Sequence, residues 1–175
     1  MNWVRSFGKH NVTAMGLFSR QENARGSVMP TYREDWAFRT TYNYADRYFI
    51  EYNGAYNGSE KFSPENRFAF FNSGAIGWMI SEEPFMKFFR EKKIVDMLKV
   101  RASYGEIGSD QLGPDPFDSS RRWLYMNQWA YGGHTTMDLN QTQSIYTWYR
   151  ESAIGNKDIQ WEVVKKLNIG IDYSF

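Results

Sequence analysis

The chain has 175 residues, with 21 Lys and Arg against 20 Asp and Glu, so its formal charge is only +1. That balance argues against a nucleic-acid binder, which needs a clustered excess of cations. The absence of cysteine excludes a disulfide framework, a thiolate zinc site and a cysteine nucleophile. Aromatic residues make up 18% of the chain while the mean hydropathy is −0.65, a combination that indicates amphipathic strands.

Alternation with a period of two is the main pattern along the chain. Residues 38–44 place Phe and Tyr against Arg, Thr and Asn at alternating positions, and residues 48–57 repeat the pattern after a three-residue connection. This spacing predicts an antiparallel hairpin. The same reasoning predicts an N-terminal stub at residues 2–7 and six strands, at about 10–19, 37–44, 48–57, 70–80, 98–105 and 163–175.

The two faces of these strands differ in a way that favours a membrane barrel. One face carries aliphatic residues flanked by Tyr, while the other carries Asn, Ser, Thr, Gly and a few charges. Aromatic residues at both ends of an apolar band are typical of a transmembrane β-barrel, where a midplane charge on the lipid face costs about 2–4 kcal/mol. A soluble β-sandwich with Tyr-rich strands remains the alternative. No run of 18 apolar residues occurs, so no transmembrane helix is expected.

The connections predict which end of the barrel faces outward. Short connections at 8–9 and 45–47 alternate with long ones at about 20–36, 57–69 and 106–160, which we expect to be extracellular loops. The medium segment 81–97 fits this rule least well. Six strands and a stub are too few for the eight-stranded minimum, so we expect part of a larger barrel.

Particular stretches resemble one family. The stretch RFAFFNSGAIGWMISEEPFM (67–86), followed by LKVRASYGEIGSDQ (98–111), resembles the late-barrel region of SusC/RagA-type TonB-dependent outer-membrane transporters. Residues 7–16, 42–62 and 155–172 resemble further stretches of the same family in the same order. The likeness covers nearly the whole chain except 112–150.

This resemblance implies a fold class and a set of partners. The expected fold is all-β, as the C-terminal part of a 22-stranded barrel in the Gram-negative outer membrane of Bacteroidota. The implied function is nutrient import of an oligosaccharide or peptide with a SusD-like surface lipoprotein, energised by TonB through a plug region that this chain lacks. The alternatives are a small self-contained outer-membrane barrel and a soluble carbohydrate-binding β-sandwich. No enzyme activity, cofactor or nucleic-acid partner is expected.

Candidate site residues fall into two groups. No catalytic or metal-binding residue is predicted, because Glu65, Glu82 and Glu83 are expected to be solvated turn residues. The first group consists of rings in the loop 106–160 that could stack on sugars, anchor a partner or simply pack the loop: Trp123, Tyr125, Trp129, Tyr131, Trp148 and Tyr149. The second group is expected to form a polar network facing the lumen and the plug: Arg39, Glu51, Lys99, Arg101 and Asp172.

Overall fold

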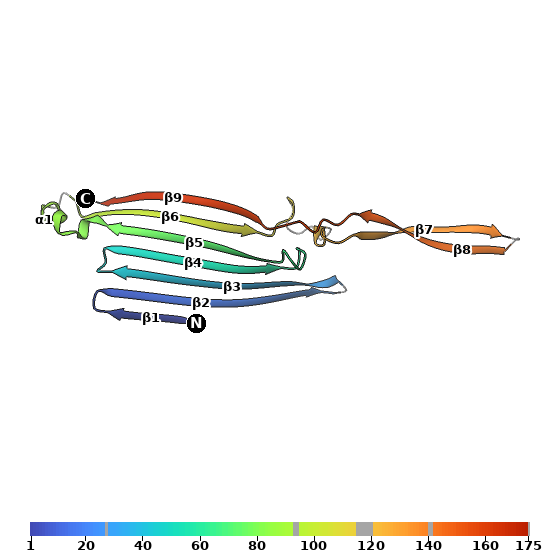
Figure 1. Cartoon of the computed structure of the whole chain (residues 1–175), viewed down its shortest axis with the longest axis horizontal. Helices are drawn as coiled ribbons and strands as arrows, with labels where there is room; N and C mark the ends of the chain where they lie inside the picture. The colour runs from blue at the N-terminus through green and yellow to red at the C-terminus, as the bar shows by residue number, and fades with distance from the viewer. Residues whose placement is uncertain (27, 93–94, 115–120, 140–141, 175) are drawn as a thin grey trace. The chain divides into compact units, whose positions relative to one another are not determined.

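The computed structural model describes residues 1–26, 28–92, 95–114, 121–139 and 142–174. Over these residues it has nine strands, two single 3₁₀ turns and one short helix (Figure 1). The strands are β1 (Asn2–Phe7), β2 (His10–Arg25), β3 (Val28–Tyr44), β4 (Tyr48–Ser59), β5 (Phe68–Met79), β6 (Met97–Ser109), β7 (Gln128–Leu139), β8 (Thr142–Ala153) and β9 (Glu162–Ser174). The 3₁₀ turns Ile80–Glu82 and Pro84–Met86 and the helix α1 (Lys87–Glu91) lie between β5 and β6. Within the described residues, no helix has the length and apolar character needed to cross a membrane.

The chain divides into two compact units. The first, here called the sheet unit, contains Met1–Ser59, Phe68–Ser109 and Trp161–Phe175. The second, here called the hairpin unit, contains Glu60–Arg67 and Asp110–Gln160. The hairpin unit is therefore built from the connection that follows β4 and from the long connection between β6 and β9.

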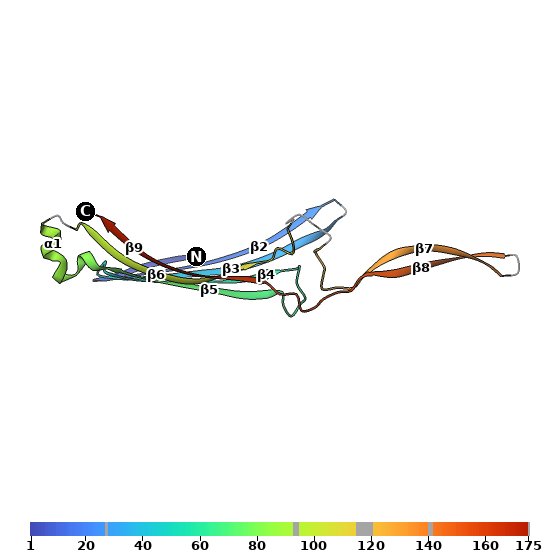
Figure 2. The ribbon, with the colours of Figure 1, turned by 90° about the horizontal axis from the view of Figure 1, so that it is seen from above.

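The sheet unit is one antiparallel sheet with the strand order β1-β2-β3-β4-β5-β6-β9. Figure 2 shows its strands as a single curved layer. Tight turns join several neighbours: the turn between β3 and β4 places Ala45 and Asp46 at φ values of 53° and 55°. The Asp46 backbone N–H donates to Asn43 Oδ1 at 3.0 Å, which stabilises this left-handed turn.

One face of this sheet is apolar and exposed. Ile50 pairs with Ile76 across β4 and β5, and Ala102 pairs with Ile169 across β6 and β9. Ile50, Ile76 and Ile169 are 50%, 62% and 74% exposed. A β-sandwich would bury these side chains against a second sheet, so the sandwich alternative is wrong. The structure confirms the all-β class and the antiparallel arrangement.

Rings mark the end of this apolar face at the β3–β4 turn. Tyr44, Tyr48 and Trp78 occupy one cross-strand row, with ring centroids 6.3 Å apart for the first pair and 6.4 Å apart for the second. Their planes are nearly parallel, at 23° and 11°. Such a row has the geometry of the aromatic girdles found at the edge of a membrane-spanning band.

Two loops predicted from the sequence are shorter in the structure. Residues 20–36 are not a loop, because β2 runs to Arg25 and β3 begins at Val28, with Ser19 paired to Asp35 and Gln21 to Arg33. The stretch RQENAR has no apolar face, so the hydrophobic pattern fades while the backbone ladder continues. Similarly, β4 runs to Ser59, two residues beyond the predicted strand end at residue 57 and into the predicted loop 57–69. The N-terminal stub predicted at residues 2–7 is confirmed as β1, whose six residues all pair with β2.

The segment 106–160 contains regular structure that the sequence did not predict. Its first residues extend β6 to Ser109, and β7 and β8 pair with each other as a separate two-stranded sheet. These two strands therefore do not join the seven-stranded sheet. The alternative of a self-contained eight-stranded barrel required two extra wall strands from this segment, so that alternative is wrong.

Candidate functional site

All five polar residues predicted to face the lumen lie on one face of the sheet, opposite the isoleucines. Cross-strand partners and residues two apart share a face, and the register links them in this way from β3 to β9. The ion pairs form within the sheet. Arg39 Nη2 lies 2.8 Å from Glu51 Oε2, and Arg101 Nη2 lies 3.4 Å from Asp172 Oδ1.

Two further contacts lie on the polar face of the sheet. Asn53 Nδ2 donates to Glu51 Oε1 at 2.9 Å, and the Lys99 ammonium lies 4.7 Å from the centre of the Phe49 ring. Because Arg39 and Arg101 remain more than half exposed, their ion pairs contribute little to folding. These contacts therefore leave an exposed surface of mixed charge on this face of the sheet.

The prediction that Glu83 is a solvated turn carboxylate is wrong, because the residue is buried. The residue is only 8% exposed, and its Oε1 accepts from the Tyr48 hydroxyl at 2.6 Å and from Trp78 Nε1 at 3.1 Å. Arg47 Nη1 lies 3.6 Å from Oε2. The hydrogen bond from Tyr48, followed by that from Trp78 and the charge of Arg47, lowers the pKa of Glu83 despite its burial. Glu65 is exposed, as expected.

This carboxylate joins the aromatic row to the connection after β5. Tyr48 begins β4 and Trp78 lies near the end of β5, whereas Glu83 lies between the two 3₁₀ turns. The sequence gives no sign of this, because Tyr48 and Glu83 are 35 positions apart. Because hydroxyl, indole and guanidinium groups surround the Glu83 carboxylate, the cluster is suited to stabilising this turn.

The hairpin of β7 and β8 carries four of the six predicted ring residues, and it divides them between its two faces. Tyr131 pairs with Tyr149 and Trp129 lies two residues before Tyr131, so these three rings share one face. Trp148 and Arg150 lie on the opposite face of the hairpin. All four rings are exposed. The rings therefore do not make a single platform.

Two glycines explain the position of Trp148. A Cβ at Gly132 would overlap the Trp148 ring, so only glycine leaves room for the indole to lie flat on the strand. Gly133, opposite Trp148, has a φ of 124° and lies at an irregularity in the pairing. On the other face, Tyr131 and Tyr149 meet edge to face with centroids 6.0 Å apart, and the Tyr131 hydroxyl lies 3.0 Å from His134 Nδ1.

The other two predicted ring residues, Trp123 and Tyr125, precede β7 in a turn and are only half-exposed. The Arg122 guanidinium lies 4.6 Å from the centre of the Trp123 ring, as in a cation–π contact. One face of that indole is thus already occupied by the protein. Among the six candidates, the three rings Trp129, Tyr131 and Tyr149 form the group best placed to touch another molecule.

Comparisons with known proteins agree on one class. No family model matches the sequence. TonB-dependent receptor P3 of Formosa agariphila is 25% identical over 98% of this chain, and TonB-dependent receptor SusC of Bacteroides thetaiotaomicron is 30% identical over 78%. The structure of the RagAB peptide transporter matches 98% of the chain with a TM-score of 0.74 at 19% identity. The chain spans 19% of receptor P3, 12% of SusC and 20% of the matching RagAB chain.

A single sheet with one exposed apolar face, together with these relatives, defines an outer-membrane β-barrel protein of the TonB-dependent receptor class. Within that class the chain belongs to the SusC/RagA-type receptors, and its seven-stranded sheet corresponds to part of their barrel wall. The relatives are receptors and transporters.

Proposed function

We propose that this chain forms part of the barrel wall of a nutrient importer that takes up oligosaccharides or peptides, is energised by TonB through its plug, and performs no enzymatic reaction. The observation that supports this most strongly is the division of the sheet into an apolar exposed face and a polar face with internal ion pairs. Lipid would contact Ile50, Ile76 and Ile169, while Arg39 and Glu51 would line a hydrated conduit.

The hairpin β7–β8 is the proposed contact point for cargo or for a SusD-like surface lipoprotein. Exposed rings with polar edges stack on sugar faces and anchor peptide side chains, and Trp129, Tyr131 and Tyr149 present three such rings on one face. In this proposal, the connections that follow β4 and β6 are extracellular and the short β3–β4 turn is periplasmic.

Cargo uptake tests the proposal directly. The receptor that carries this chain is deleted in its bacterium, and growth is measured on oligosaccharides and on oligopeptides as sole nutrient source, with and without TonB. We expect growth on one of these classes to require both the receptor and TonB. Growth on both classes without the receptor would contradict the import function.

The role of the rings needs a separate experiment. Replacing Trp129, Tyr131 and Tyr149 together by Ala should reduce uptake, or capture of a co-purifying lipoprotein, while the receptor remains at its normal level in the outer membrane. Trp148→Ala is the matched control on the opposite hairpin face. Equal uptake and equal lipoprotein capture in the triple variant and the wild type would contradict the contact role of the hairpin.

A further inference from the structure

The connection between β4 and β5 is a well-packed, hydrogen-bonded turn. Within Glu60–Arg67, Phe62 is fully buried and Ser63 is 5% exposed. The Asn66 backbone N–H donates to the Ser63 carbonyl at 3.0 Å, which closes the turn. A connection with a buried ring and internal hydrogen bonds holds its shape, unlike a solvated loop.

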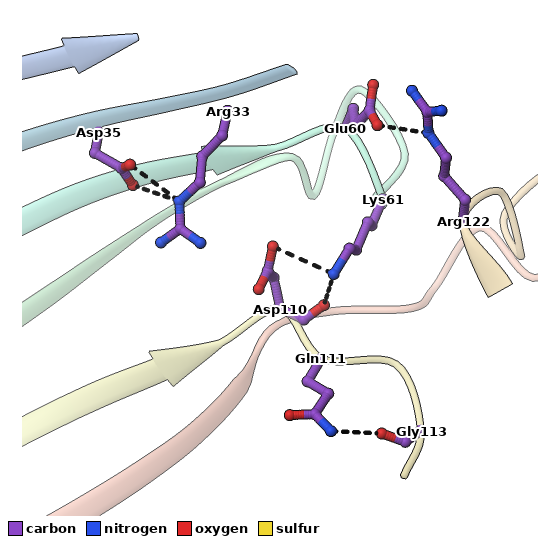
Figure 3. Close-up of polar contacts among 8 residues, drawn as sticks. All are labelled: Arg33, Asp35, Glu60, Lys61, Asp110, Gln111, Gly113 and Arg122. Atoms are coloured by element: carbon purple, nitrogen blue, oxygen red, sulfur yellow. Dashed lines mark hydrogen bonds and ion pairs between the residues drawn. The ribbon is translucent and has the colours of Figure 1, made fainter. Parts of the chain in front are cut away.

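Glu60 ties this turn to the chain that enters the hairpin. Arg122 Nε donates to Glu60 Oε1 at 2.6 Å, and the two side chains are only 8% and 16% exposed (Figure 3). Removing one partner of such a nearly dry, charge-assisted pair leaves the other charge uncompensated, which costs far more than breaking a surface ion pair. Arg122 lies six residues before the start of β7, and its guanidinium also contacts Trp123.

The adjacent residue Lys61 extends in another direction, to the chain that follows β6. Its Nζ donates to the Asp110 carbonyl at 3.1 Å and lies 3.7 Å from Asp110 Oδ2 (Figure 3). The neighbouring Gln111 amide donates to the Gly113 carbonyl at 2.9 Å. Glu60 and Lys61 therefore fasten two separate stretches of the long connection to one turn.

The chain that leaves the hairpin is tied to the same turn. The Ser63 hydroxyl and the Asn66 amide both donate to the Lys157 carbonyl at 3.1 Å. The chain before β7 and the chain after β8 are also hydrogen-bonded to each other. The Gly155 N–H donates to Asn127 Oδ1 at 2.8 Å, and the Asn156 N–H donates to the Leu124 carbonyl at 2.8 Å.

We infer that Glu60–Arg67 is a socket that binds the chain on both sides of the β7–β8 hairpin, before β7 and after β8. Glu60 and Arg122 are then positioning residues for the hairpin face that carries Trp129, Tyr131 and Tyr149. A two-stranded ribbon alone is marginally stable in water, so its base decides how well its rings are preorganised for contact. The inference depends on the proposed contact function for its consequence in uptake, whereas the grip itself can be measured independently.

Hydrogen exchange of the intact receptor in detergent measures the grip. In Arg122→Gln, which leaves Glu60 buried and uncompensated, we expect the amides of β7 and β8 to exchange about tenfold faster or more, with the amides of β3 to β5 unchanged. Arg122→Lys, which restores the charge, should recover part of the protection. Asn66→Ala removes one bond to the chain after β8 and should give a smaller increase, so the inference stays testable if Arg122→Gln fails to assemble.

Asp172→Asn, which breaks the exposed ion pair with Arg101 in the sheet, is the matched control and should leave hairpin exchange unchanged. Wild-type exchange in the hairpin of both Arg122→Gln and Asn66→Ala would overturn the socket. Faster exchange together with reduced uptake supports both the socket and the contact function. Faster exchange with normal uptake supports the socket and contradicts the contact function, while reduced uptake with normal exchange overturns the socket alone.

Discussion

The sheet and the hairpin use similar residues in different ways. In the sheet, side chains are sorted by face, with Ile50 and Ile76 on one side and Arg39 and Glu51 on the other. In the hairpin, exposed rings occupy both faces, as Tyr149 and Trp148 illustrate. Sorting indicates two different solvents, one on each side of the sheet. The unsorted hairpin indicates a single aqueous environment, in which its stability depends on its base.

The largest effect is expected from a charge on the apolar face of the sheet. Ile76→Arg should destabilise the assembled barrel by about 2–4 kcal/mol, because the guanidinium would have to enter hydrocarbon. The measurement is the fraction of receptor in the outer membrane that migrates as a folded species on unheated gels. Ala75→Arg, one residue away on the face shared with Glu51, is the matched control and should assemble normally. Equal loss in both variants would show that the two faces have the same environment.

A steric change in the hairpin should have the next largest effect. Gly132→Ala places a Cβ where the Trp148 ring lies, so the ring must move, at a cost of about 1–3 kcal/mol. Faster hydrogen exchange confined to β7 and β8 is the expected result. Gly16→Ala in β2, where a Cβ meets open space, should leave its strand unchanged. Unchanged exchange in the Gly132 variant would mean that Trp148 does not lie over this glycine.

Glu83 should give a pH-dependent effect. Because its pKa is lowered in the folded state, its stabilisation is fully present above the unfolded value of about 4.3 and is lost as the pH falls through the lower, folded value. Thermal unfolding of Glu83→Gln should therefore show its largest deficit at neutral pH and a shrinking deficit below pH of about 4. Tyr48→Phe removes the main donor and should reduce this pH dependence. A deficit that is constant with pH would contradict the role of the Glu83 charge.

The smallest effect is expected from the exposed polar-face pair. Asp172→Asn should change stability by about 0–1 kcal/mol, because Arg101 stays hydrated when its partner is lost. The Asp172→Asn and Arg101→Gln double-mutant cycle measures their coupling energy directly. A coupling well above 1 kcal/mol would indicate a dry environment on this face, contrary to a water-filled conduit.

The sequence predicts the centres of the sheet strands and the separation of its faces, because alternation in stretches such as 48–57 directly reflects a wall with two solvents. It does not predict the continuation of β2 and β3 through polar residues, where backbone pairing persists without a hydrophobic pattern. The hairpin also escaped prediction, since rings on both of its faces remove the alternation. The pairs Glu60–Arg122 and Tyr48–Glu83 join positions 62 and 35 residues apart, and no local pattern encodes such contacts.

The central claim is that the isoleucine face of the sheet contacts lipid while the opposite face contacts water. Spin labels placed singly at positions 50, 76 and 169, and at 53, 75 and 170, in the intact receptor in lipid bilayers measure it most directly. We expect the first three labels to collide preferentially with oxygen, which concentrates in lipid, and the second three with a water-soluble nickel chelate. Similar collision ratios for both sets, or water access at positions 50 and 76, would contradict the claim.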